Sequence, residues 1–127
     1  MWKNYLSIVL LLTSCMYIRP KQNSMSDLSQ NEWAQGLNEQ PRAVVLDVRT
    51  EEEFESGYIP NAINIDIQMG NIFIDEINTL DKNKSYYVYC RSGARSAQAV
   101  QLMRDLGFNE TYNLLGGILE WEGEVID

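Results

Sequence analysis

The stretch that decides the fold is residues 86–107, YYVYCRSGARSAQAVQLMRDLG. Its first four residues have the aromatic and β-branched composition of a strand. The loop Cys90–Ser96 (CRSGARS) follows, and Gly107 supplies a helix stop. Between them, apolar residues recur at the i, i+3, i+4, i+7 spacing of one helix face: Ala99, Leu102, Met103 and Leu106. The stretch therefore predicts a strand, a loop that begins with a cysteine, and a helix.

The same alternation continues on both sides of this stretch. Ser29 with Glu32, and Thr50 with Glu53, match the capping box and predict two helix starts. The other predicted elements are strands over 43–48, 62–67 and 111–115, and helices over 69–80 and from Gly116. Such close alternation predicts an α/β fold with a mainly parallel sheet of about five strands and helices on both faces. Ligands bind beyond the carboxyl ends of such strands, which is where Cys90 falls.

Composition narrows the classes of function. The 127 residues are 45% hydrophobic and 22% charged, which suits one domain with a packed core. A formal net charge of −8 argues against a nucleic-acid partner. The chain has no histidine, which excludes a Ser-His or Cys-His catalytic pair and removes the commonest metal ligand. We expect neither a metal nor a cofactor.

The beginning of the chain has the pattern of an export signal. Tyr5–Leu12 is an apolar run too short to span a bilayer, and Leu12-Thr13-Ser14-Cys15 resembles a bacterial lipobox. The resemblance implies a signal peptide over 1–14, lipid on Cys15, a tether over 15–25 and a domain over 26–127. It also implies export and anchoring to a bacterial membrane facing the periplasm, with Met16 favouring the outer membrane. The alternative is a plain secretory signal in which Cys15 carries no lipid.

Cys90 has the surroundings of a reactive thiol. If Cys15 carries lipid, Cys90 is the remaining thiol of the sequence, without a cysteine partner for a disulfide. Unpaired N–H groups of the loop and of the first helical turn can gather around one anion. Arg91 and Arg95 add positive charge, and Gly93 permits unusual backbone angles. These features predict a lowered pKa for Cys90. The alternative is a buried structural cysteine.

Three segments together resemble rhodanese-like domains: CRSGARS, LDVRTEEEFESGYIPNAINI (46–65) and GGILEW (116–121). The resemblance implies a rhodanese-like three-layer fold with Cys90 cycling between thiol and persulfide. It implies that the following residues surround the sulfur or begin the next helix: Arg91, Ser92, Gly93, Ala94, Arg95 and Ser96. Asp47 and Arg49 match a charged pair that supports the loop, and we interpret them as a structural ion pair. Tyr58 and Asn61 depart from the family's usual His and Gly.

The resemblance implies a sulfurtransferase that moves sulfur from a donor such as thiosulfate to cyanide, a thiol or an acceptor protein. A phosphatase is disfavoured, because the related phosphatase loops place five residues between cysteine and arginine, whereas four separate Cys90 and Arg95. A second hypothesis is a membrane-tethered module in which Cys90 accepts sulfur only from a partner protein, or in which the loop binds anions without catalysis. A third is a redox sensor in which Cys90 is oxidised.

Overall fold

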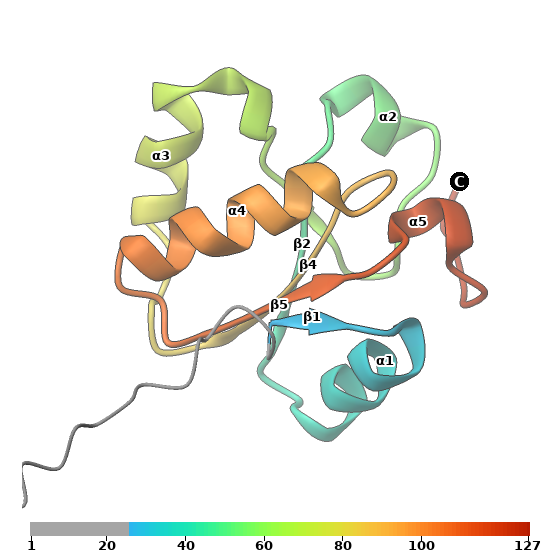
Figure 1. Cartoon of the computed structure of the whole chain (residues 1–127). Helices are drawn as coiled ribbons and strands as arrows, with labels where there is room; N and C mark the ends of the chain where they lie inside the picture. The colour runs from blue at the N-terminus through green and yellow to red at the C-terminus, as the bar shows by residue number, and fades with distance from the viewer. Residues whose placement is uncertain (1–25) are drawn as a thin grey trace, which may run out of the picture.

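The computed structural model describes residues 26–127 (Figure 1). Its elements alternate along the chain as follows: β1 (Asp27–Leu28), α1 (Gln30–Glu39), β2 (Val44–Asp47), α2 (Glu51–Glu55), β3 (Ile63–Asn64), the 3₁₀ turn η2 (Ile67–Met69), α3 (Asn71–Asn78), β4 (Ser85–Tyr89), α4 (Ala94–Asp105), β5 (Glu110–Leu114) and α5 (Gly117–Glu120). The predicted α/β fold is confirmed.

The strands form one sheet in the order β1-β5-β4-β2-β3, and every pairing is parallel. β4 is the central strand, and all five of its residues are buried. Burial on both faces explains the apolar and aromatic composition of β4, since a strand covered on both sides has no solvent-facing positions. The carboxyl ends of β2 and β4 lie in register, with Asp47 opposite Tyr89. Cys90, which follows β4, therefore lies at the carboxyl edge of the sheet, near the middle of that edge.

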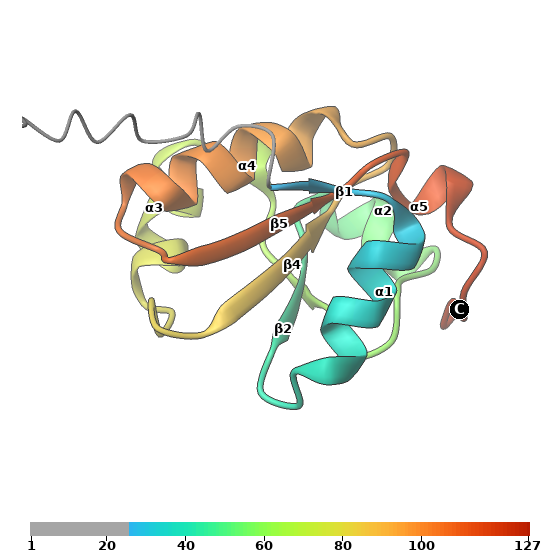
Figure 2. The same cartoon turned by 60° about the horizontal axis from the view of Figure 1, so that its bottom comes forward.

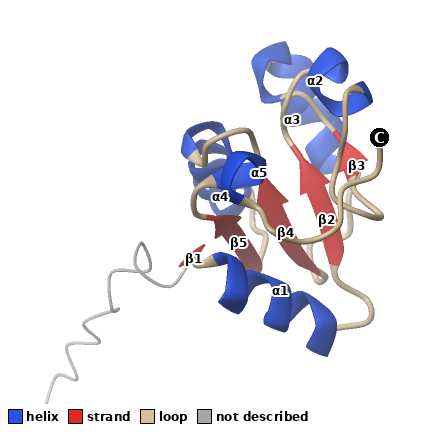
Figure 3. Ribbon diagram, turned by 90° about the vertical axis from the view of Figure 1, so that its right-hand side faces the viewer, coloured by secondary structure: helices blue, strands red, loops and turns tan. Residues whose placement is uncertain are grey.

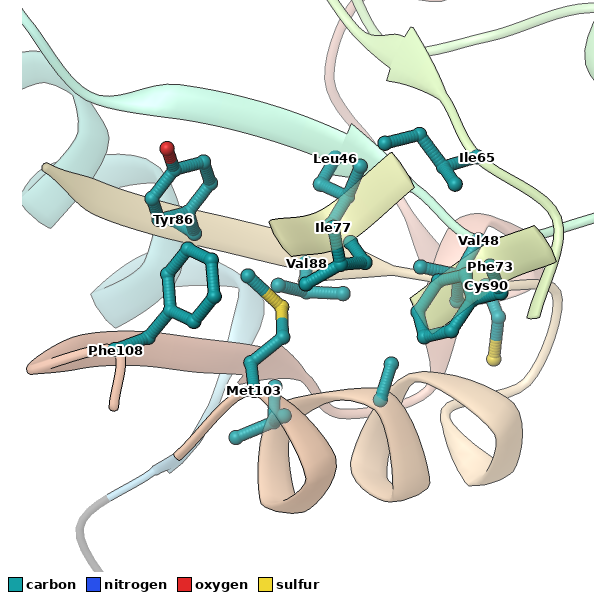
Figure 4. Close-up of a cluster of buried hydrophobic side chains, with 12 residues drawn as sticks. Leu46, Val48, Ile65, Phe73, Ile77, Tyr86, Val88, Cys90, Met103 and Phe108 are labelled. Carbon is teal, nitrogen blue, oxygen red and sulfur yellow. The ribbon is translucent and has the colours of Figure 1, made fainter. Parts of the chain in front are cut away.

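Helices cover the two faces of the sheet (Figures 2 and 3). Two hydrophobic clusters lie between the helices and the sheet. On one face, Val88 and Cys90 of the β4 segment pack with Phe73 and Ile77 of α3 and Met103 of α4 (Figure 4). On the other face, a second cluster joins the sheet to α1 and α5; its residues include Trp33, Tyr87, Tyr89, Leu114 and Trp121. The predicted three-layer arrangement is confirmed.

Both predicted capping boxes are present. The Ser29 side chain accepts a hydrogen bond from the Glu32 amide, and the Glu32 carboxylate accepts one from the Ser29 amide. Thr50 and Glu53 make the same pair of bonds at the start of α2. Each pair satisfies amides that would otherwise lack a partner at a helix start.

Two element predictions need correction, and one strand was missed. The predicted strand over 62–67 is limited to Ile63–Asn64, because Asp66 caps the amide of Gln68 and turns the chain into η2. The helix predicted over 69–80 runs over 71–78, so Met69 lies outside it and is 51% exposed. β1 was not predicted, because two residues at a sheet edge carry no periodic signal.

The predicted signal peptide, the lipidation site Cys15 and the whole tether over 15–25 lie outside the described residues, which are 26–127. None of the helices within residues 26–127 has the length and apolar character needed to cross a bilayer.

Candidate functional site

Cys90 follows β4 directly and begins the loop to α4 at the carboxyl edge of the sheet. Its side chain lies at the end of the cluster on the α3 and α4 face, beside Val48 and Phe73 (Figure 4). The residue is 1% exposed. A thiol so deeply placed depends on its immediate neighbours, rather than on water, to stabilise a negative charge.

Two donors contact the sulfur of Cys90 directly. The Gly93 amide lies 3.1 Å from Sγ, and the Ser96 hydroxyl donates to it at 3.2 Å. Burial is the largest effect on the thiol and taken alone would raise its pKa. The Ser96 hydroxyl and the amides of Ser96, Gly93 and Ser92 outweigh it, so the pKa of Cys90 lies below its ordinary value. The predicted direction of the shift is confirmed.

Gly93 gives the loop its shape. Its φ of 104° lies in the left-handed region, and it occupies the N-cap position of α4. A Cβ there would lie 3.4 Å from backbone atoms of Leu114 and Gly116, so the loop packs closely on the chain after β5. Asn113, which is 1% exposed, donates to the Gly93 carbonyl at 3.3 Å and to the Asp27 carboxylate at 3.0 Å. Asn113 thus ties the loop to β1 and β5.

The two loop arginines have different surroundings. Arg95 makes a bidentate ion pair with Glu53 of α2, with N···O distances of 2.7 and 2.8 Å. These hydrogen bonds are the largest cause that lowers the pKa of Glu53, to about 2. The charge of Arg95 is therefore shared with a carboxylate. Arg91 is exposed, and its guanidinium forms no ion pair within residues 26–127. Arg91 is available to a ligand anion.

The Gly116-Gly117 pair holds the other side of the loop. The amides of Ile118 and Leu119 donate to the carbonyls of Cys90 and Arg91 at 3.0 and 3.1 Å. Gly117 has a φ of 59°, and a Cβ there would lie 2.3 Å from the Arg91 carbonyl oxygen. Sequence reasoning identified GGILEW as a family segment but missed this contact with the cysteine loop.

The predicted ion pair between Asp47 and Arg49 is confirmed. Arg49 donates to both carboxylate oxygens of Asp47, with a shortest distance of 2.7 Å, and to the Gly57 carbonyl. Both residues are buried. Both residues adjoin Tyr89, the residue that precedes Cys90. Asp47 lies opposite Tyr89 in the sheet, and the Arg49 guanidinium lies over the Tyr89 ring. The pair therefore supports the strand ends and makes no hydrogen bond to the sulfur.

The two departures from the family pattern fit their positions. Asn61 has a φ of 67° and is the one residue other than glycine with a positive φ within residues 26–127. Asparagine tolerates this region better than most residues, so it can replace glycine. Tyr58 stacks on Phe54 with ring centroids 4.3 Å apart and pairs through its backbone with Ile126. The ring stacking and the backbone pairing of Tyr58 do not involve residues 90–96.

Comparison with known proteins agrees with this geometry. The rhodanese-like domain profile matches residues 30–124. The chain belongs to the rhodanese-like domain family. A rhodanese-like domain protein of Staphylococcus aureus superposes with a TM-score of 0.67 at 35% identity. The match covers 79% of this chain and 94% of the Staphylococcus aureus chain. The human single-domain sulfurtransferase TSTD1 superposes with a TM-score of 0.63 at 28% identity, covering 78% of this chain and 98% of its own.

Sequence relatives of this rhodanese-like chain have mixed names. A sulfurtransferase of Allochromatium vinosum is 32% identical, covering 76% of this chain and 88% of the relative. The uncharacterized protein YqhL of Bacillus subtilis is 35% identical, with coverages of 93% and 86%. A tRNA uridine(34) hydroxylase of Legionella pneumophila is 36% identical over 82% of this chain, which spans 42% of that protein. The family and the sulfurtransferases among these proteins support a general sulfur-transfer role.

Proposed function

We propose that this protein is a sulfurtransferase that carries sulfane sulfur as a persulfide on Cys90, taking it from a donor such as thiosulfate and passing it to a thiol or cyanide. The observation that carries the proposal is the sulfur of Cys90, which accepts hydrogen bonds from the Gly93 amide and the Ser96 hydroxyl at the carboxyl edge of a parallel sheet. These donors favour the thiolate, which is the nucleophilic form of cysteine.

The first half-reaction loads the cysteine. The Cys90 thiolate attacks the outer sulfur of thiosulfate and forms a new S–S bond, while the S–S bond of thiosulfate breaks. Sulfite leaves with the bonding electron pair, and the charge moves to the terminal sulfur of the persulfide. The transferred sulfur keeps the oxidation level that it had in thiosulfate, so the step needs no oxidant or reductant, and no proton is exchanged.

The second half-reaction transfers the sulfur from Cys90 to an acceptor. An acceptor thiolate or cyanide attacks the terminal sulfur, its bond to Cys90 breaks, and Cys90 leaves as a thiolate. The loop amides that lower the pKa of Cys90 also make it a good leaving group. Arg91, exposed beside the cysteine, can attract anionic donors to an otherwise acidic protein.

Steady-state kinetics with thiosulfate and cyanide test this proposal. Two half-reactions that share one persulfide predict parallel lines in double-reciprocal plots, the signature of ping-pong turnover. Cys90→Ser should abolish thiocyanate formation. Turnover that survives in Cys90→Ser would refute the assignment of the persulfide to Cys90.

A second candidate function is a relay module that accepts sulfur from a protein rather than from free thiosulfate. The 1% exposure of Cys90 favours it, because a partner that reshapes the loop would give access to the sulfur. If thiosulfate leaves Cys90 unloaded while a persulfidated protein loads it, the relay replaces thiosulfate transfer as the function.

We also propose that Cys15 is lipidated, so that the domain works from a bacterial membrane on its periplasmic side. The support is the order of the apolar run, the small residues and the cysteine at 5–15. Cells supplied with a labelled fatty acid should incorporate the label into the parent protein and not into Cys15→Ser. A parent protein that gains no label would contradict lipidation.

A further inference from the structure

A groove lies between α2 and α3 on the side of the molecule that carries the cysteine loop. It encloses about 480 Å³ and is bounded by α2, the segment from β3 through η2, and α3. Figures 1 and 3 both show α2 and α3 as neighbours at this end of the fold. Its apolar lining comprises Phe54, Ile65, Met69, Ile72 and Phe73.

The apolar lining is open to solvent in part. Met69 and Ile72 are each 51% exposed. Neither is needed to fill the core, because the clusters on both faces are built without them. Exposed apolar side chains in a concave, polar-rimmed site are typical of a surface that binds another molecule.

The rim of the groove has one sign of charge. Four carboxylates line it, those of Glu51, Glu55, Asp66 and Glu76, and no lysine or arginine lines it in the described part of the chain. A groove of this kind attracts a cationic segment and repels an acidic one. The apolar floor adds a requirement for an apolar side chain between the cationic ones.

The groove adjoins the cysteine loop. Phe73 lines the groove and packs in the same cluster as Cys90 (Figure 4). Phe54 also lines it, and the preceding residue, Glu53, is ion-paired with Arg95 of the loop. The pKa of Arg95 is raised mainly by its hydrogen bonds to Glu53 and, among weaker effects, by the charges of Cys90 and Asp66. A molecule in the groove would therefore lie beside the persulfide.

We propose that this groove docks the protein that exchanges sulfur with Cys90, through a segment of that protein in which an apolar side chain is flanked by lysine or arginine. This inference rests on the proposed sulfur-transfer function. Residues 16–25 of the chain itself include Arg19 and Lys21, but the described chain begins at β1, on the opposite edge of the sheet from β3. This separation favours a partner protein over the tether.

A binding experiment tests the groove without sulfur chemistry. The probe is a fluorescent peptide with two leucines flanked by four lysines, and the matched peptide carries glutamates instead. Full-length Cys90→Ser protein should bind the lysine peptide about tenfold more tightly, with an affinity that falls as salt rises. Glu55→Lys/Glu76→Lys should weaken that binding about tenfold, because it reverses two rim charges. Ile72→Ser should weaken it about fivefold by removing apolar contact.

The control reverses two acidic residues that do not line the groove. Glu39→Lys/Glu122→Lys has the same net charge as the groove variant, and both residues are exposed. Equal weakening by the two pairs, or equal binding of the two peptides, would overturn the proposal. If Arg19→Glu/Lys21→Glu tightens lysine-peptide binding, the tether occupies the groove and the partner assignment is wrong; unchanged binding supports the partner.

The same variants separate this proposal from the function on which it rests. The groove pair should transfer sulfur from thiosulfate to cyanide no more slowly than the parent, because neither small molecule needs the groove and the added lysines do not repel anions. It should transfer sulfur to a cysteine-bearing lysine peptide about tenfold more slowly than the parent. Failure of thiosulfate loading in the parent would count against the proposed function alone, since the binding arm uses protein without Cys90.

Discussion

The Ser96 hydroxyl donates a hydrogen bond to the sulfur of Cys90 at 3.2 Å from the first turn of α4. Among the effects that lower the pKa of the thiol, this bond is the strongest, although burial opposes it. The helix that follows the loop therefore both positions the cysteine and supports its negative charge.

Ser96→Ala should raise the pKa of Cys90, because the thiolate loses a donor while burial remains. The rate of alkylation by iodoacetamide rises with pH through this pKa, so its midpoint should move to higher pH. At neutral pH the rate should fall about tenfold, since a hydrogen bond to a charged group contributes about 1.5 kcal/mol. Ala97→Ser, at an exposed position of the same helix, is the control and should keep the parent profile. An unchanged profile in Ser96→Ala would contradict the role given to the hydroxyl.

The Glu53–Arg95 pair should make stability depend on acid pH. Because the folded pKa of Glu53 is about 2, the pair stabilises the protein fully above the unfolded pKa of about 4.3 and loses this contribution as pH falls toward 2. The pair is partly exposed, so the loss should be about 1 kcal/mol. Glu53→Gln keeps a side chain that suits the capping box. Between pH 5 and pH 2.5, its free energy of unfolding in urea should fall by about 1 kcal/mol less than that of the parent. Equal losses in parent and variant would contradict the assignment.

Gly117 and Gly70 offer two substitutions that differ in what a new side chain would meet. Their φ values are 59° and 58°, but a Cβ at Gly117 meets the Arg91 carbonyl, whereas a Cβ at Gly70 has nothing within 4 Å. Gly70→Ala should cost only backbone strain, about 1–3 kcal/mol, because the φ of 58° and ψ of −118° at Gly70 are a conformation that residues other than glycine rarely adopt. Gly117→Ala should cost at least about 1 kcal/mol more and lower the sulfur-transfer rate of the folded protein, because the loop must shift. Equal unfolding free energies for the two variants would show that Gly117 does not fix the loop.

Asp47→Ala should destabilise the fold by about 3–5 kcal/mol, because it leaves the Arg49 guanidinium buried without its carboxylate. Chemical denaturation measures this cost. The double variant Asp47→Ala/Arg49→Met should recover part of it, since the uncompensated charge is gone. A double variant less stable than Asp47→Ala would argue that Arg49 has a further essential contact.

Local signals in the sequence predicted much of this fold. The capping boxes at Ser29 and Thr50 act over three residues, so the helix starts could be read directly. The uninterrupted burial of β4 follows from its composition. β1 could not be predicted in this way, because its two residues become a strand only by pairing with Asn113 and Leu114 of β5.

The site was predictable in its centre and less so in its supports. Cys90 and its loop lie in one continuous segment, so their grouping is visible in the sequence. The partner of Arg95 is Glu53, 42 residues away, and the loop glycine is held by Asn113, 20 residues away. Contacts of this kind depend on which strand ends meet at the edge of the sheet. Local periodicity does not predict the order of the strands.

The most direct test of the central claim is the intact mass of the purified protein after incubation with thiosulfate, beside a Cys90→Ser control. The account predicts that the parent gains one sulfur atom, that cyanide removes it, and that the control gains none. A folded parent with a free Cys90 thiol that gains no sulfur would contradict persulfide formation from thiosulfate.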